Sequence, residues 1–224
     1  MLLNLDKLNR VLELPRHRSS KTDISAAVNT VHVEAGIRVY ELNKALLAAG
    51  FALKNTGAIA QQSIAGATQT GTHGTGFELG SMSSQLTEIT LVLANGTLTT
   101  CSASKHPQLF GAARVGLGAL GIVVRARIEV VPKFKLRRIA MPYKLDQLLS
   151  DLPRLNAQYS RLQWYYTPYT QNATLLLRIP VPIDTPIVPC WPGDVMRSQR
   201  DGRNVTCVDW SFFVYFCLFL FIFV

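Results

Sequence analysis

The segment from Ser63 to Gly76, SIAGATQTGTHGTG, has the composition of a loop that contacts a ligand through its backbone. It holds four glycines, four threonines, two alanines and one histidine, and no Lys, Arg, Asp or Glu. Glycines permit positive φ angles and close approach of a ligand. Successive backbone N–H groups and threonine hydroxyls can then bind an anion. The stretch is poor material for a helix or a core, so it predicts either backbone lying against a flat or anionic ligand, or a glycine-rich connection without one.

The Gly/Thr stretch does not match the common phosphate-binding motifs. It lacks the GxGxxG spacing and the GxxxxGK[ST] spacing, and no helical pattern follows its glycines. Phosphate binding at a helix N-terminus is therefore not predicted here. His73 shares no ligand spacing with the other histidines, which are His17, His32 and His106. The sequence predicts no metal site.

The elements before this stretch predict a β-α-β unit. Residues 29–36 alternate apolar and polar side chains, as a strand does. A helix is predicted next, ending near Gly50, from the helical spacing of Val39, Leu42, Leu46 and Ala49. Residues 51–55 then return as a short strand. The Gly/Thr stretch is thus entered directly from folded structure.

The elements after it predict an antiparallel hairpin and a long strand. The hairpin spans residues 86–102 and turns at Asn95 and Gly96. Pro107 suits the first turn of a helix. Residues 122–132 alternate, which predicts a half-exposed antiparallel strand. Its predicted inner face consists of Val124, Ala126, Ile128 and Val130.

A basic run at residues 133–138 predicts a domain change. Beyond it, residues 143–160 predict a helix interrupted at Pro153, and residues 161–170 and 172–182 predict strands. We expect three parts, which are residues 1–132, 133–209 and 210–224.

Composition limits the classes of function. The chain has 224 residues, 48% of them hydrophobic, and a formal net charge of +9, which is typical of a globular protein. Its basic clusters accompany no nucleic-acid motif, so we interpret them as solvated loops and expect no nucleic-acid partner. Four widely spaced cysteines without a CxxC pair argue against a zinc site or a dense disulfide framework.

The final segment, Trp210 to Val224, is almost wholly apolar. As a helix it would reach only about 22 Å, against a hydrocarbon thickness of about 30 Å. Shallow membrane contact, aggregation and a tail foreign to the fold all stay open. The amino terminus has no signal-peptide pattern.

Long parts of the sequence resemble a known enzyme family. The segment VHVEAGIRVYELNKALLAAGFALKNTGAIAQQSIAGATQTGTHGTG closely resembles the sugar-1,4-lactone oxidases, which are flavoproteins of the vanillyl-alcohol-oxidase superfamily. LNLDKLNRVLEL, LTEITLVLANGTLTTCS and LFGAARVGLGALGIVVRARIEVVP continue the match in the expected order. The resemblance implies an α+β fold of the FAD-binding PCMH type, with two flavin subdomains and a cap domain downstream.

The resemblance also implies a cofactor, a substrate and a set of binding residues. The cofactor would be FAD, the substrate a sugar 1,4-lactone and the acceptor molecular oxygen, which would yield an ascorbate-type product and hydrogen peroxide. The positions matching the family's flavin-binding segments are Ser63, Ala67, Gly71, Thr72, His73, Gly74, Gly118, Gly121 and Ile122. No catalytic residue is assigned.

Two family elements have no counterpart in this sequence. They are the Gly-His-Ser phosphate loop, which precedes the matched opening strand, and a His-Trp-Gly-Lys element near the carboxy terminus. We therefore expect an incomplete amino-terminal part, a truncated cap domain and, at most, weak non-covalent FAD binding. The alternative function is a truncated, non-catalytic flavin-domain fragment with membrane contact through Trp210–Val224. The expected location is a membrane, endoplasmic-reticulum or mitochondrial, or the cytoplasm.

Overall fold

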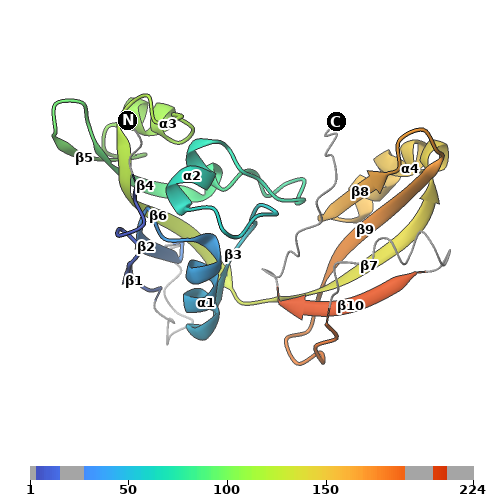
Figure 1. Cartoon of the computed structure of the whole chain (residues 1–224). Coiled ribbons are helices and arrows are strands. Elements are labelled where there is room, and N and C mark those ends of the chain that lie inside the picture. The colour runs from blue at the N-terminus through green and yellow to red at the C-terminus, as the bar shows by residue number, and fades with distance from the viewer. Residues whose placement is uncertain (1–3, 16–27, 190–203, 211–224) are drawn as a thin grey trace. The chain divides into compact units, whose positions relative to one another are not determined.

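The structure is a computed structural model that describes residues 4–15, 28–189 and 204–210. These residues divide into two compact units (Figure 1). Unit 1 comprises the described residues within 1–74 and 80–133, and unit 2 comprises those within 75–79 and 134–210. The Gly/Thr stretch thus contributes to both, because its last two residues are assigned to unit 2.

Unit 1 is a six-stranded antiparallel sheet with helices. Its strands follow the order β1-β2-β6-β4-β5, and β3 pairs with β6. Their bounds are β1 Val11–Glu13, β2 Thr30–Glu34, β3 Phe51–Leu53, β4 Leu86–Val92, β5 Leu98–Ser102 and β6 Ile122–Pro132. Its helices are α1 Val39–Ala48, α2 Ile64–Gln69 and α3 Pro107–Ala113, with a short 3-10 turn, η1, at Ser83–Gln85.

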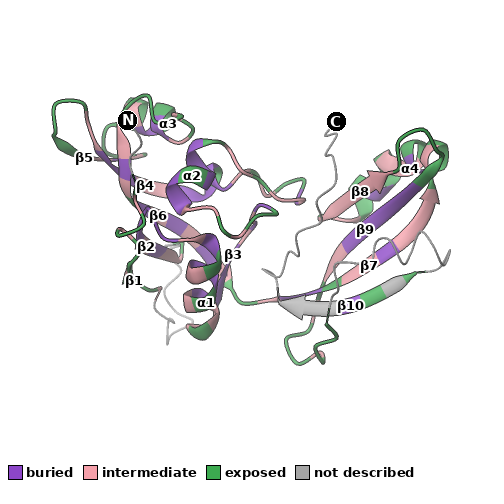
Figure 2. Ribbon diagram, in the orientation of Figure 1, coloured by how far each residue is buried: buried purple, intermediate pink, exposed green. Residues whose placement is uncertain are grey.

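The core of unit 1 joins helices α1 and α2 to one face of the sheet. Leu42 and Leu46 of α1 and Ile64 of α2 are fully buried in one cluster with side chains of β2, β4 and β6. Figure 2 shows this buried interior in purple. The β-α-β opening, the hairpin at Asn95–Gly96 and the helix starting at Pro107 are confirmed.

Strand β6 differs from its predicted alternation at one end. Ala126, Ile128 and Val130 face the core as predicted, but Val123 is buried there and Val124 is only half-buried. The reason is an irregularity in the ladder: Thr90 is opposite Arg125 and Leu91 is opposite Val123, so Val124 has no counterpart on β4. An extra residue of this kind reverses the alternation beyond it.

Unit 2 is a four-stranded antiparallel sheet with one long helix. The strand order is β10-β7-β9-β8. The bounds are β7 Lys135–Lys144, α4 Leu145–Gln158, β8 Leu162–Tyr166, β9 Asn172–Val181 and β10 Val205–Trp210. Leu148 and Leu155 of α4 pack against Ala173, Leu175 and Leu177 of β9.

Helix α4 continues through Pro153, so the predicted interruption is wrong. Pro153 is exposed, and its ring therefore lies on the solvent side of the helix. The residues around it, Leu148 and Leu155, are buried against the sheet. Packing on both sides of the proline offsets its unfavourable helix propensity.

Candidate functional site

The first half of the Gly/Thr stretch is a short helix, although its composition argued against one. Ser63 caps α2, since its Oγ accepts a hydrogen bond of 3.1 Å from the backbone N–H of Gly66. Ala67 is fully buried in the core. These two predicted cofactor-binding residues therefore hold α2 in place, Ser63 through its side chain and Ala67 through packing.

The turn after α2 is held by hydrogen bonds on both sides. Gly71 has a φ of +68°, which an alanine would adopt only with strain. The backbone N–H of Thr72 donates to Ala67 O (2.9 Å), and Thr72 O accepts from the N–H of Met82 (2.8 Å). The Thr72 hydroxyl accepts from Gln62 Nε2 at 3.2 Å. The backbone of this turn is thereby fixed before any ligand binds.

His73 lies at the exposed edge of the turn. Its Nδ1 is 3.0 Å from Gly74 O, and its backbone forms an isolated antiparallel bridge with Ser81. The side chain belongs to no group of metal-ligating residues in the described part of the chain.

Gly74 lies against Asn55 at a place where no side chain fits. A Cβ on Gly74 would come within 2.1 Å of Asn55 Oδ1 and 2.5 Å of Thr56 O. Position 74 therefore accommodates only glycine.

The second predicted stretch, residues 116–122, approaches the first through Gln69. Gln69 Nε2 donates to Ala113 O (2.7 Å), and Gln69 O accepts from the N–H of Leu117 (3.3 Å). Gly118 has a φ of +76° with its N–H 3.5 Å from Gln69 Oε1. The structure therefore brings the loop containing Gly118 beside helix α2.

Gly121 and Ile122 join this loop to the sheet. Gly121 has a φ of +141°, and a Cβ there would lie 2.5 Å from Val92 O. Ile122 is directly opposite Val92 in the β4–β6 ladder. Residues 116–121 have the order GxGxxG, but they follow a helix and precede a strand, the reverse of a dinucleotide-binding fold.

The sequence analysis missed three polar residues that support this site. Asn55, Gln69 and Gln85 are all buried. Gln85 Nε2 donates to Asn55 O at 3.0 Å, which fixes the residue beneath Gly74. Buried amides of this kind carry no sequence signal, because their partners lie far away along the chain.

The residues present fit a large, doubly phosphorylated, planar cofactor. The turn from Gly71 to Gly74 is half-exposed apart from the exposed His73, and it contains no acidic side chain that would repel phosphate. Gly71 and Gly74 carry no side chain that would keep a ligand away from the main chain. These features are those expected of one wall of an FAD site.

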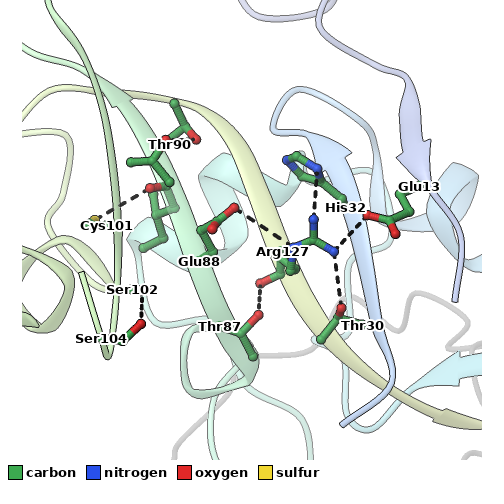
Figure 3. Close-up of polar contacts among 12 residues, drawn as sticks. Glu13, Thr30, His32, Thr87, Glu88, Thr90, Cys101, Ser102, Ser104 and Arg127 are labelled. Carbon is green, nitrogen blue, oxygen red and sulfur yellow. Dashed lines mark hydrogen bonds and ion pairs between the residues drawn. The ribbon is translucent and has the colours of Figure 1, made fainter. Parts of the chain in front are cut away.

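A second polar cluster lies on the sheet face of unit 1 away from α1 and α2 (Figure 3). Arg127 of β6 donates to Glu13 Oε2 at 3.0 Å and to Thr30 Oγ1 at 3.5 Å, and lies 4.0 Å from Glu88 Oε1. Its Nη2 is 3.5 Å from His32 Nδ1. Because Arg127 is already surrounded by protein partners, we interpret this cluster as a structural link across four strands, β1, β2, β6 and β4.

Burial and the positive charge of Arg127 lower the pKa of His32. The imidazole is thereby favoured in its neutral form.

Among the described helices, none is long and apolar enough to cross a membrane. The segment from Ser211 to Val224, for which membrane contact was predicted, lies outside the described residues.

A family model and curated relatives match this chain. Residues 1–102 match the model of an FAD binding domain. The chain is 36% identical over 197 residues to D-arabinono-1,4-lactone oxidase of Yarrowia lipolytica, covering 86% of this chain and 36% of that protein. It is 40% identical over 176 residues to the enzyme of the same name from Eremothecium gossypii, covering 78% of this chain and 32% of that protein.

An animal relative and a solved structure are also similar to this chain. L-gulonolactone oxidase of Bos taurus is 33% identical over 177 residues, which are 78% of this chain and 38% of that protein. A solvent-stable cholesterol oxidase superimposes with a TM-score of 0.61 at 21% identity, covering 71% of this chain and 34% of that one, which shows the fold. The chain spans about a third of the length of the curated relatives it matches.

The fold and the glycine-lined turn define the class as an α+β FAD-binding protein of the PCMH type, which confirms the predicted fold. The cofactor predicted from the sequence, FAD, is confirmed by the same family match. Within this class, the chain is similar to the sugar-1,4-lactone oxidases, and the resemblance predicted from the sequence is confirmed by these relatives.

Proposed function

We propose that this chain forms part of an FAD-dependent oxidoreductase that oxidises a sugar 1,4-lactone, with molecular oxygen as the acceptor. Arabinono-, gulono- and galactono-1,4-lactone are the candidate substrates. The observation that carries the proposal is the turn from Gly71 to Gly74, where hydrogen bonds hold a backbone of small residues in place and position 74 accommodates only glycine. The names of the relatives, which are lactone oxidases, support the choice of substrate.

The residues proposed to contact the cofactor divide by role. In the turn after α2, Gly71, Thr72, His73 and Gly74 present main-chain and hydroxyl groups to FAD, while Ser63 and Ala67 hold α2 beneath them. In the second loop, Gly118, Gly121 and Ile122 contact it through their backbone. Each loop is fixed by hydrogen bonds to distant residues, so the binding surface is organised in advance.

The chemistry that FAD supplies when bound is acceptance of a hydride equivalent from the substrate and reoxidation by molecular oxygen. The part of the protein described above binds and orients the cofactor. We assign no catalytic side chain among the described residues.

The test compares flavin retention in two alanine variants of the full chain. Gly74→Ala places a Cβ 2.1 Å from Asn55 Oδ1, whereas a Cβ at Gly111 in helix α3 meets no atom within 4 Å. We expect Gly74→Ala to lose most of its bound flavin and Gly111→Ala to keep it, with matching circular-dichroism spectra. Lactone-dependent release of hydrogen peroxide should follow flavin content.

Equal flavin retention in both variants would remove Gly74 from the site, and lack of lactone-dependent peroxide in flavin-loaded protein would overturn the proposed reaction. Gly71→Ala is a second variant in case Gly74→Ala does not fold. Its Cβ has space, with 3.7 Å to the nearest atom, Val115 Cγ1, but its φ of +68° strains an alanine.

We also propose that Trp210–Val224 contacts a membrane, because so apolar a segment is rarely left in water. Deleting residues 211–224 should raise soluble yield and shift the protein away from the membrane fraction. Lower soluble yield with unchanged fractionation would mean that the segment is part of a core.

A further inference from the structure

Three arginines form a row across neighbouring strands of unit 2. Arg138 of β7 is directly opposite Arg178 of β9. On the other side, the backbone N–H of Arg178 donates to the carbonyl oxygen of Arg161, which immediately precedes β8, at 3.0 Å. Like charges in opposite positions on adjacent strands destabilise a sheet. The row therefore gathers positive charge on this part of the sheet.

The row lies on the sheet face away from helix α4. Along β9, Leu175 and Leu177 pack in the cluster that contains α4. Since successive side chains of a strand point to opposite faces, Thr174 and Arg178 point the other way. The arginines consequently share a face with the polar side chains of β8.

Arg178 is half-buried, and its hydrogen-bond acceptors are uncharged. Its Nη2 donates to Gln163 Oε1 at 3.1 Å and its Nη1 to Thr75 Oγ1 at 3.4 Å. Burial, with smaller contributions from Arg138 and Arg161, lowers the pKa of Arg178 to about 10. The guanidinium thus stays positively charged at neutral pH, while its two acceptors, the Thr75 hydroxyl and the Gln163 amide oxygen, do not neutralise its charge. A desolvated cation in this situation gains strongly from an anionic partner.

The polar network continues from Arg178 along β8. Gln163 Nε2 donates to the Tyr165 hydroxyl oxygen at 2.6 Å, and Tyr165 is directly opposite Thr174. The Thr174 hydroxyl is fully buried without a hydrogen-bond partner among the described residues. An unsatisfied buried hydroxyl costs about 1–3 kcal/mol.

Arg161 is also oriented by an aromatic ring. Its guanidinium carbon lies 5.2 Å from the centre of the Phe134 ring. Stacking of this kind fixes the plane of a guanidinium, and its N–H donors lie in that plane. The row is therefore built from side chains whose positions are set by neighbouring groups.

We propose that this face of unit 2, centred on Arg178 with Gln163 and Thr75, binds a small planar oxyanion. A guanidinium matches a group with two coplanar oxygens, such as a carboxylate or the enolate of an enediol lactone. This proposal rests on the proposed function, because the ligand would come from lactone oxidation. Oxidation of a lactone hydroxyl gives a ketolactone that enolises and loses a proton, and hydrolysis of a lactone gives a sugar carboxylate. The site would then hold an anionic product more tightly than the neutral substrate.

The experiment is titration calorimetry of the full chain with three probes. Sodium ascorbate presents an enediol-lactone enolate, sodium gluconate a sugar carboxylate, and galactono-1,4-lactone the neutral reference. We expect one of the anions to bind more tightly than the lactone. Arg178→Gln should weaken the binding of that anion about tenfold, because it removes one hydrogen bond to a charged group. The affinity for galactono-1,4-lactone should stay unchanged.

Two further variants separate charge from structure. Arg178→Lys keeps the charge without the paired donors and should give an intermediate loss, and Arg138→Gln tests the row if Arg178→Gln does not fold. Arg154→Gln, on α4 and paired with Asp151 at 3.3 Å, is the matched control and should change nothing. Binding of ascorbate alone identifies the oxidised lactone as ligand, and binding of gluconate alone the sugar acid.

The proposal is overturned if neither anion binds, or if Arg178→Gln lowers the affinities for the anion and for the neutral lactone equally. Calorimetry needs no turnover, so failure of this site is distinguishable from failure of lactone oxidation.

Discussion

The buried carboxylate of Glu34 accepts hydrogen bonds from both the backbone and the side chain of Arg10. Arg10 Nη2 lies 2.7 Å from Oε1, and Arg10 Nε and the backbone N–H of Arg10 lie 3.2 and 3.0 Å from Oε2. The Glu34 side chain is 4% exposed, whereas that of Arg10 is 73% exposed. The exposed residue therefore satisfies a buried one and fixes the segment before β1 to β2.

Replacing Arg10 with alanine should lower the melting temperature by several degrees, because it removes two of the hydrogen bonds to a buried charge. The hydrogen bond from the Arg10 side chain is the main cause of the lowered pKa of Glu34. The stabilisation is thus complete above about pH 4.5 and is lost as the pH falls through the folded-state pKa. Melting curves of Arg10→Ala and wild type should converge in acid, with the exposed Arg137→Ala as control. Parallel curves at every pH would contradict this.

His32 should make the protein less stable in mild acid. Burial and Arg127, with a smaller contribution from Arg125, lower its pKa, while Glu88 and Glu13 act in the opposite direction. A lowered folded-state pKa means that the unfolded chain binds the proton more readily. The contribution of His32 is therefore complete above about pH 6.5 and is lost progressively below it. Urea unfolding between pH 7.5 and 5.5 should show a smaller decline in His32→Gln than in wild type. An equal decline in both would assign the effect to other groups.

Pro153→Ala should stabilise unit 2. Pro153 is exposed within helix α4 and has no N–H to donate to the preceding turn. Alanine restores the donor and the higher propensity, which should raise the free energy of unfolding by about 1–3 kcal/mol. Chemical denaturation measures the change, and Pro168→Ala, in an exposed turn, is the comparison. Destabilisation by Pro153→Ala would show that α4 needs the proline in its present geometry.

Gly121→Ala should destabilise unit 1. Its φ of +141° is a conformation that only glycine adopts readily, and the new Cβ would meet Val92 O at 2.5 Å. We expect a loss of about 1–3 kcal/mol or more in the free energy of unfolding. Gly96→Ala has a φ of +80° but open space, so it should cost less. Similar losses in the two variants would mean that the loop relaxes to accept the methyl group.

The sequence alone determined the features that depend on neighbouring residues. The β-α-β opening, the Asn95–Gly96 turn and the helix at Pro107 were predicted because apolar periodicity and turn residues act over a few positions. The family was also recognisable from motifs that are contiguous in the chain. These signals placed the Gly/Thr stretch next to folded elements but gave no partner for any of its residues.

Tertiary structure decided what distant residues do to one another. Residues 64–69 form a helix despite Gly66 and Thr68, because Ile64 and Ala67 are buried in the core and Ser63 caps the first turn. Gln69, the last residue of α2, donates to the carbonyl oxygen of Ala113, the last residue of α3, which lies 44 positions away, and no local pattern contains this contact. The arginine row arises in the same way, since strand register sets Arg138 beside Arg178. Packing and register act across the sheet, so only the folded chain brings such residues together.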